Sequence, residues 1–175
     1  NVLNALQKEA VVKTLKADHF LLVNGPPGAG KTTLIAHMVL AHLERGERIL
    51  IATSTNRALD QALTKLIRDE ACADKLLRLG SPLSASEELS PYTVSELVEK
   101  NGLSRTQTAL LKCPIVGATI STLQAGNYLI GTDKFDLVIV DEATQATIPD
   151  TLGAISFGKH FVLIGDPKQL SPIVQ

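Results

Sequence analysis

The sequence contains no tryptophan, and only 3% of its 175 residues are aromatic. Its two tyrosines, Tyr92 and Tyr128, are too isolated to form a platform on which nucleic-acid bases could stack. It has only two cysteines, Cys72 and Cys113, which lie far apart and in no C-x-x-C or Cys/His cluster. This spacing argues against a disulfide framework and against a zinc site, so we expect two reduced, packed thiols.

The chain also lacks an excess of either charge, since 17 basic residues nearly balance 18 acidic ones. The formal net charge of −1 provides no bulk cationic field that could hold nucleic acid. Any such binding must therefore use local loops, a partner domain or sequence outside this chain.

Long apolar runs are missing as well. None approaches the roughly 20 residues that span a bilayer, and no charged segment followed by an apolar one opens the chain. These absences predict a cytoplasmic or nuclear protein with no membrane partner. The chain begins with Asn1 rather than methionine, and its last residue, Gln175, follows an apolar pair. We therefore expect an excised piece of a longer protein.

What is present is enough for one globular domain, because apolar residues make up 45% of the chain and charged residues 20%. The residues at 25–32 fit the phosphate-binding pattern G-x-x-x-x-G-K-[ST] at every fixed position, and they stand between an apolar run and a helical pattern. They are Gly25, Pro26, Pro27, Gly28, Ala29, Gly30, Lys31 and Thr32.

Each residue type in this loop has a physical reason. Glycines let consecutive backbone N–H groups turn toward a polyphosphate, and the following helix adds its positive N-terminal end. Lys31 can reach the terminal phosphates, and the Thr32 hydroxyl can ligate Mg²⁺. The pattern therefore predicts a nucleoside triphosphate as the ligand.

Strand and helix patterns alternate along the chain. We expect a helix that ends near residues 16–18, helices over about 34–43 and 58–67, and one that begins near Pro149. The expected strands are Phe20–Val23, which should be buried, Arg48–Ala52, Leu76–Leu79, Ile115–Ala118, Leu137–Val140 and Phe161–Ile164. The first two should form a parallel pair with a right-handed crossover. The fold class predicted is α/β, a three-layer sandwich around a mainly parallel sheet.

The alternation breaks at about residues 81–112, which are polar and serine-rich. Two short helical patterns lie there, after a Thr93-x-x-Glu96 box and after Ser104-x-x-Gln107. We expect a small helical insertion at the edge of the sheet, with a plain surface loop as the alternative.

A second chemical signal is the apolar strand Leu137–Val140, which ends in Asp141 and Glu142. Open α/β sheets bind ligands at the carboxyl ends of their strands. Asp141 is placed to hold the Mg²⁺ shell, and Glu142 to orient and deprotonate the attacking water. Together with the loop at Gly25, this pair predicts hydrolysis; a solvated strand end is the plainer alternative.

Three segments in order resemble motifs I, II and III of superfamily 1 helicases: Gly25–Thr33, Asp141-Glu142-Ala143-Thr144-Gln145 and Gly165–Pro172. The branch suggested contains the nonsense-mediated-decay helicase and the nuclease-helicase of Okazaki-fragment processing. Further segments resemble its Q motif, its motif Ia and the short motif after the insertion; they are Leu3–Val11, Ser54–Asp60 and Gly117–Ser121. The resemblance implies that residues 1–175 are the first RecA-like, P-loop NTPase domain of an ATP-dependent helicase.

The resemblance also implies roles for single residues. Gln7 would read the adenine edge, Gln169 would sense the γ-phosphate, and Gln145 would connect Mg²⁺ and phosphate to the nucleic-acid side. The plainer alternatives are a solvated helix residue for Gln7 and polar loop residues for the other two. Contacts to the backbone of single-stranded DNA or RNA are implied for four residues that could equally well cap helices, namely Ser54, Asn56, Thr119 and Ser121.

One departure concerns the loop, where Ala29 replaces a threonine common in the family; little loss is expected, since the loop binds through its backbone. The second RecA-like domain, which in the family supplies the arginine finger, is not in this sequence. We therefore expect the isolated chain to bind Mg·ATP weakly and to hydrolyse it very slowly. Two alternatives stay open: a P-loop ATPase of another class, such as an AAA-type remodeller, and a nucleotide-dependent binding module without turnover.

Overall fold

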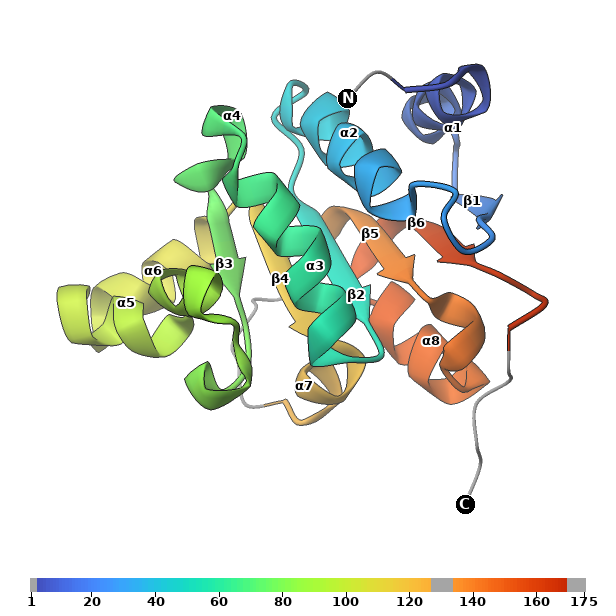
Figure 1. Ribbon diagram of the computed structural model, residues 1–175. Coiled ribbons are helices and arrows are strands. Elements are labelled where there is room, and N and C mark those ends of the chain that lie inside the picture. The colour runs from blue at the N-terminus through green and yellow to red at the C-terminus, as the bar shows by residue number, and fades with distance from the viewer. Residues whose placement is uncertain (1–2, 127–133, 170–175) are drawn as a thin grey trace.

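The computed structural model describes residues 3–126 and 134–169, and it contains a six-stranded sheet between helices (Figure 1). The sheet order is β1-β6-β5-β2-β4-β3, and every pair of neighbouring strands is parallel. The strands are β1 Phe20–Asn24, β2 Ile49–Thr53, β3 Leu76–Arg78, β4 Ile115–Thr119, β5 Phe135–Asp141 and β6 Gly158–Gly165. The predicted α/β class with a mainly parallel sheet is confirmed.

The helices lie between the strands in sequence. They are α1 Ala5–Lys16, α2 Lys31–Leu43, α3 Asn56–Ile67, α4 Glu70–Ala73, α5 Val94–Asn101, α6 Leu103–Lys112, α7 Ile120–Gln124 and α8 Ile148–Ile155. Short 3₁₀ turns occur at Pro82–Ser84, Glu87–Tyr92 and Ala143–Gln145. The sequence patterns missed α4 and α7, whose four and five residues are too short to show a helical period. Among the described residues, no helix has the length and apolarity that crossing a membrane requires.

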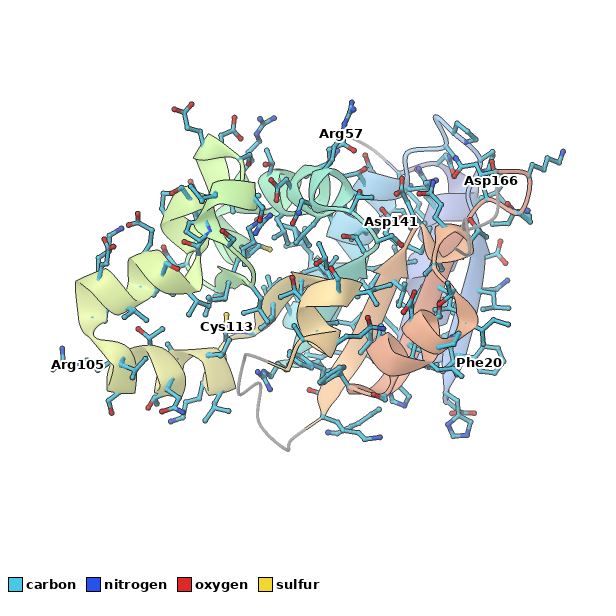
Figure 2. The ribbon with its side chains drawn as sticks, turned by 90° about the horizontal axis from the view of Figure 1, so that it is seen from below. Phe20, Arg57, Arg105, Cys113, Asp141 and Asp166 are labelled. Carbon is cyan, nitrogen blue, oxygen red and sulfur yellow. The ribbon has the colours of Figure 1, made fainter. Side chains whose placement is uncertain are left out.

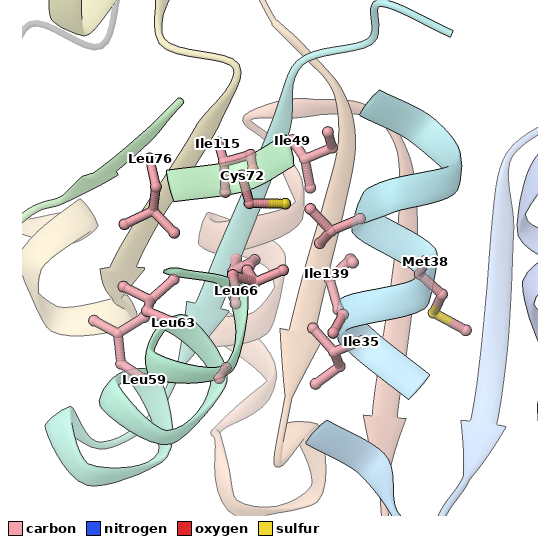
Figure 3. Packing of buried hydrophobic residues seen from close by; sticks show 14 of the residues in the cluster. Ile35, Met38, Ile49, Leu59, Leu63, Leu66, Cys72, Leu76, Ile115 and Ile139 are labelled. Carbon is pink, nitrogen blue, oxygen red and sulfur yellow. The ribbon is translucent and has the colours of Figure 1, made fainter. Parts of the chain in front are cut away.

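Both faces of the sheet are buried at its central strands, which gives the three predicted layers. Alternate residues of one strand enter different clusters, since Ile49 and Ile51 of β2 face α2 and α3 whereas Leu50 and Ala52 face the side of α7 and α8. Figure 3 shows the first cluster, in which Ile35 and Leu63 pack over the sheet. Both cysteines are free and buried, as predicted, and burial raises the pKa of each thiol to about 11.

Two expectations about the first strand are wrong. β1 is an edge strand rather than a buried one, and Phe20 and Leu22 remain 56% and 64% exposed. β1 and β2 are parallel but not paired, because β6 and β5 lie between them. The chain first builds the β4–β3 side of the sheet and then returns to fill the gap. This topology places the ends of β1, β5 and β6 side by side.

The expected helical insertion exists at the β3 edge, where α5 and α6 project from the domain (Figure 1). Its caps differ from those predicted. The Thr93 hydroxyl donates to the carbonyl of Ser90 and makes no cap bond to α5. Helix α6 begins one residue before Ser104, after Gly102 at φ 78°, so Ser104 cannot cap it.

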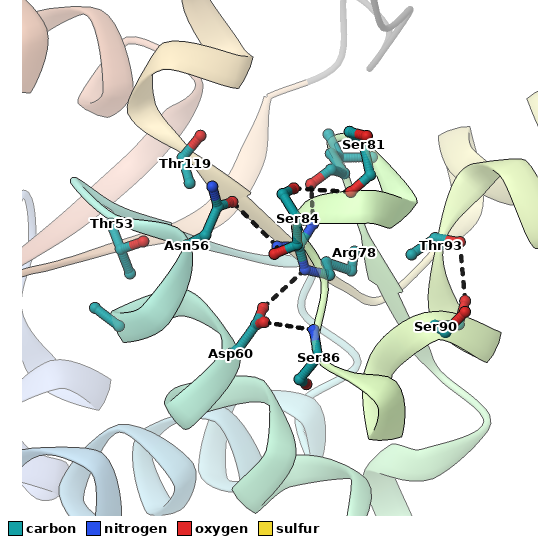
Figure 4. A network of polar contacts seen from close by, with 12 residues as sticks. Thr53, Asn56, Asp60, Arg78, Ser81, Ser84, Ser86, Ser90, Thr93 and Thr119 are labelled. Atoms are coloured by element: carbon teal, nitrogen blue, oxygen red, sulfur yellow. Dashed lines mark hydrogen bonds and ion pairs between the residues drawn. The ribbon is translucent and has the colours of Figure 1, made fainter.

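A buried arginine ties the insertion to the sheet. Arg78, at the end of β3, is fully buried, and its guanidinium donates to Asp60 of α3 at 2.8 Å, to Asn56 at 3.1 Å and to the carbonyl of Ser84 at 2.9 Å (Figure 4). The second carboxylate oxygen of Asp60 accepts the backbone N–H of Ser86 at 2.7 Å. These bonds satisfy the buried charges and fix where the insertion starts.

Replacing Arg78 with methionine is expected to lower the free energy of unfolding by about 3–5 kcal/mol, because it leaves the Asp60 carboxylate without its cationic partner. Urea unfolding of the variant would measure this loss. Arg68→Met is the matched control, since Arg68 makes only an exposed ion pair with Glu88, and it should lose a small fraction of that amount. Equal losses in the two variants would contradict this account.

Candidate functional site

The predicted phosphate-binding loop connects β1 to α2. Gly28 and Gly30 have φ of 77° and 75°, a left-handed conformation that favours glycine. The loop is anchored to the sheet because Gly25 N–H donates to the carbonyl of Gly165 at the end of β6, at 2.9 Å. Ala29 N–H donates to the carbonyl of Pro26 at 3.1 Å, which closes the turn. The loop is thus shaped by its own backbone before any ligand binds.

Lys31 begins α2 and lies across the loop. A Cβ at Gly25 would come within 2.8 Å of the Lys31 Cγ and 2.9 Å of its Cδ, so only glycine admits this close packing. Thr32 and Thr33 follow in the first helical turn. The Thr33 hydroxyl accepts a hydrogen bond from Lys65 of α3 at 2.8 Å. Sequence patterns did not single out Lys65 as a contact to the loop helix, because nothing in its spacing shows which neighbour it meets.

Asp141 ends β5 beside this loop (Figure 2). Burial raises the pKa of its carboxyl, whereas the N–H of Glu142, which donates to Oδ1 at 2.9 Å, and the positive charge of Lys31 act in the opposite direction. A desolvated carboxylate of this kind is stabilised when a cation binds.

The oxygen ligands at this edge suit Mg²⁺. The Asp141 carboxylate and the Thr32 hydroxyl are hard donors, and Mg²⁺ commonly takes only one or two protein ligands beside water and phosphate oxygens. Within the described ranges no three His, Cys, Asp or Glu side chains gather as a metal cage. The residues therefore fit a metal that arrives with a nucleotide.

Glu142 has an unusual backbone. Its φ of 54° and ψ of 36° make it left-handed, and it is the one non-glycine residue with positive φ among those described. Such a conformation costs of order 1–3 kcal/mol and persists where the surroundings enforce it, often at active sites. The tight 3₁₀ turn Ala143–Gln145 follows, and Gln145 N–H donates to the Glu142 carbonyl at 2.8 Å. The strained residue is the predicted general base.

The two predicted glutamines of motifs II and III meet in space. Gln145 Nε2 donates to Gln169 Oε1 at 3.2 Å, which joins the turn after β5 to the loop after β6. Gln169 N–H also donates to the carbonyl of Asp166 at 3.0 Å. Leu170, Ser171 and Pro172 of the same motif lie outside the described residues.

Gln7 spans from α1 to the loop. Its Nε2 donates to the carbonyl of Ala29 at 2.9 Å, and its Oε1 accepts the N–H of Asn4 at 3.0 Å within a capping box. It is therefore not a merely solvated helix residue. A pocket of about 490 Å³ opens between α1, β1 and the loop, and its lining includes Gln7, Leu21 and Lys31. This volume is within the usual range for small-molecule sites.

Two of the four residues predicted to touch nucleic acid share a hollow. Ser54 follows β2, Ser121 lies in α7, and both line a hollow of about 290 Å³ together with Gln145. The Ser54 hydroxyl oxygen is buried and has no hydrogen-bond partner in the part of the chain that the structure describes. Ser54 thus brings an unpaired hydroxyl to the wall of the hollow.

The other two side chains are occupied by structural bonds. Thr119 caps α7 by accepting the N–H of Thr122 at 3.2 Å, which was the alternative that the sequence left open. The Asn56 oxygen accepts from Arg78, while Thr55 rather than Asn56 caps α3. The hollow does not include either residue among its lining.

Comparisons with known proteins agree with these motifs. A sequence profile of the family described as "AAA domain" matches residues 2–112 and 103–175, which is nearly the whole chain. The chain belongs to this AAA domain family.

Relatives of this chain include a DNA replication ATP-dependent helicase/nuclease, JHS1, of Arabidopsis thaliana. It is 36% identical over 173 residues, which are 99% of this chain and 12% of the relative. The human DNA replication ATP-dependent helicase/nuclease DNA2 is 34% identical over 177 residues, covering 98% of this chain and 16% of that protein. The chain therefore spans less than a fifth of the length of these relatives.

Solved structures share the fold at low identity. The UvsW helicase from bacteriophage T4 matches with a TM-score of 0.63 and 20% identity, over 93% of this chain and 52% of that one. A nuclease-deletion mutant of the Type ISP restriction-modification enzyme LlaGI matches with a TM-score of 0.65 and 16% identity, over 99% of this chain and 18% of that one. These likenesses support the predicted RecA-like arrangement of this AAA domain.

Proposed function

We propose that this chain is the first RecA-like, ATP-binding domain of a superfamily 1 helicase or translocase that couples ATP hydrolysis to movement along a single strand. The observation that carries the proposal is the turn after β5. Its Glu142 lies beside the phosphate-binding loop, and its Gln145 both bonds Gln169 and lines the Ser54–Ser121 hollow. One short segment thus connects a nucleotide site with a nucleic-acid site.

The relatives' names favour a particular branch and substrate. They are called DNA replication ATP-dependent helicase/nucleases, so we assign the chain to the Okazaki nuclease-helicase side of the branch, with single-stranded DNA as the substrate. A nuclear or cytoplasmic location is compatible with that role. The name of the AAA domain family does not by itself favour an AAA-type remodeller, because the relatives that this chain matches are named helicase/nucleases.

Within the nucleotide site, Lys31 would hold the terminal phosphates while the backbone N–H groups of Gly28–Thr32 surround them. Thr32 and Asp141 would hold Mg²⁺, which when bound neutralises charge between the phosphates. Glu142 would take a proton from the attacking water, and Gln169 would contact the γ-phosphate. The remaining loop residues, Pro26, Pro27, Ala29 and Thr33, would support the shape of the loop.

On the nucleic-acid side, Ser54 and Ser121 would hydrogen-bond the strand backbone within their hollow. Asn56 and Thr119 keep the same proposed role in weaker form, because their oxygens already serve Arg78 and helix α7. The Asn56 amide N–H groups are left to contact a strand, whereas the Thr119 hydroxyl also shares hydrogen bonds with the hydroxyls of Ser121 at 3.0 Å and Thr122 at 2.8 Å. A second RecA-like domain would close the cleft and supply an arginine to the phosphates.

The adenine-reading role of Gln7 separates this function from the other enzymatic alternative. Gln7→Ala should lower the affinity for Mg·ATP by about 5-fold to 10-fold and should reduce the preference of the chain for ATP over GTP, since a side-chain amide offers both a donor and an acceptor to a base. Titration of the purified chain with the two nucleotides would measure both changes.

The control is Lys8→Ala, which changes the neighbouring exposed residue of α1. An unchanged ATP-to-GTP preference in Gln7→Ala would favour a P-loop ATPase of another class. In that case the bond from Gln7 to Ala29 would be a purely structural link between α1 and the loop.

A further inference from the structure

Thr144 lies in the turn after β5, and the motifs give its hydroxyl no task. Its Oγ1 is buried and has no hydrogen-bond partner in the ranges that the structure describes. Burying a hydroxyl without a partner costs free energy of folding, so a valine of the same shape would be the better choice for stability alone. The hydroxyl at this position therefore calls for a reason beyond packing.

The contacts of Thr144 place it at a junction. A Cβ on Gly165 would lie 2.8 Å from Thr144 Cγ2, 3.1 Å from its backbone nitrogen and 3.1 Å from its Oγ1. Gly165 ends β6, and its carbonyl accepts the N–H of Gly25 from the phosphate-binding loop. Thr144 therefore lies against Gly165, the residue that anchors the phosphate-binding loop and precedes the loop Asp166–Gln169.

The residue after Gly165, Asp166, offers an acceptor for the Thr144 hydroxyl. Asp166 is buried, and its Oδ1 accepts the N–H of Lys168 at 2.9 Å. A carboxylate can accept about four hydrogen bonds, so Asp166 has capacity for more. Gln169 reaches toward the turn, where its Oε1 accepts a hydrogen bond from Gln145.

We propose that Thr144 is a positioning residue that distinguishes ATP from ADP, with its hydroxyl donating to the Asp166 carboxylate once Gln169 has left Gln145 for the γ-phosphate. The hydrogen bond from Thr144 to Asp166 then replaces the one from Gln145 to Gln169 as the link between the turn and the loop Asp166–Gln169. Glu142 therefore stays fixed relative to Gln169 during hydrolysis. With ADP the exchange does not occur, and the hydroxyl stays unpaired. This inference rests on the proposed ATPase function and deepens it.

Thr144→Val tests the exchange, because it removes the hydroxyl and keeps the shape. The purified chain is measured for thermal unfolding without nucleotide and for the dissociation constants of Mg·ATPγS and Mg·ADP. We expect the melting temperature of the variant to rise by about 2–4 °C. We also expect its preference for ATPγS over ADP to fall about fivefold, the equivalent of one hydrogen bond.

Two further variants act as controls. Thr144→Ser keeps the hydroxyl and should retain the nucleotide preference of the wild type. Ser86→Ala removes the other buried, unpaired hydroxyl that lies away from the site, in the insertion. It should raise the melting temperature without changing the preference.

Two results would overturn the proposal. If Thr144→Val gains stability as Ser86→Ala does and its preference for ATPγS over ADP is unchanged, the Thr144 hydroxyl has no role in distinguishing the nucleotides. A Thr144→Val chain that loses stability shows that the hydroxyl is already bonded in the absence of nucleotide. The wild type is measured first, because a chain that binds neither nucleotide would show that the proposed function itself is wrong.

Discussion

Replacing Lys31 with alanine is expected to lower ATP hydrolysis at least about 100-fold, because it removes the charge that meets the terminal phosphates. The structure places this charge at the loop. Lys31 lies across Gly25 at the mouth of the loop, and its charge already acts on Asp141. Lys65 of α3 is held by its hydrogen bond to the Thr33 hydroxyl.

Hydrolysis is measured in a protein that joins this chain to the proposed second RecA-like domain. Nucleotide affinity is measured in the chain alone. The control is Lys16→Ala, which changes an exposed lysine at the C-terminal end of α1. It should leave both the hydrolysis rate and the nucleotide affinity unchanged. Turnover within a few-fold of the wild type in Lys31→Ala would remove the phosphate-binding loop from the mechanism.

Glu142→Gln is expected to lower hydrolysis by about 10²–10⁴-fold while Mg·ATP still binds with the affinity of the wild type. The change removes the base but keeps the size of the side chain and its hydrogen-bonding atoms, so binding and chemistry should separate. Single-turnover hydrolysis and equilibrium binding, measured on the same protein, would give the two numbers. If affinity and turnover fell together by the same factor, Glu142 would be a binding group instead.

The strained backbone of Glu142 provides an independent check of the same role. Glu142→Gly should relieve the left-handed strain and raise the stability of the chain, while turnover is lost as completely as in Glu142→Gln. Gly46, which has φ 72° in a turn beyond α2, marks a position where glycine already occupies this conformation. A less stable Glu142→Gly chain would mean that the side chain of Glu142 supports the fold.

The arrangement of the loop and the acids of the candidate nucleotide site could be predicted from the sequence because each is a contiguous segment. The loop at Gly25 and the acids at Asp141 each follow an apolar strand, and the carboxyl ends of parallel strands share one edge of a sheet. The Gln145–Gln169 contact was not predicted as such. It depends on β5 and β6 being neighbours, and strand order is not written in the spacing of apolar residues.

The expectations that failed share a cause, which is that local patterns do not reveal tertiary partners. Phe20–Val23 is apolar like a core strand, yet β1 lies at the edge of the sheet. Thr93 has the spacing of a capping box, but its hydroxyl donates to the carbonyl of Ser90. Local patterns likewise did not show that the Asn56 oxygen accepts a hydrogen bond from Arg78, which lies 22 positions away within the expected strand Leu76–Leu79.

The central claim is that the turn after β5 couples the nucleotide site to a bound strand. The most direct test is the rate of ATP hydrolysis by this chain joined to its proposed second RecA-like domain, measured with and without a single-stranded DNA oligonucleotide and with Glu142 intact. The account predicts slow turnover without DNA and a strong increase when the strand is added. A protein that binds ATP and DNA but shows no turnover with the strand present would contradict it, and would identify the chain as a nucleotide-dependent binding module.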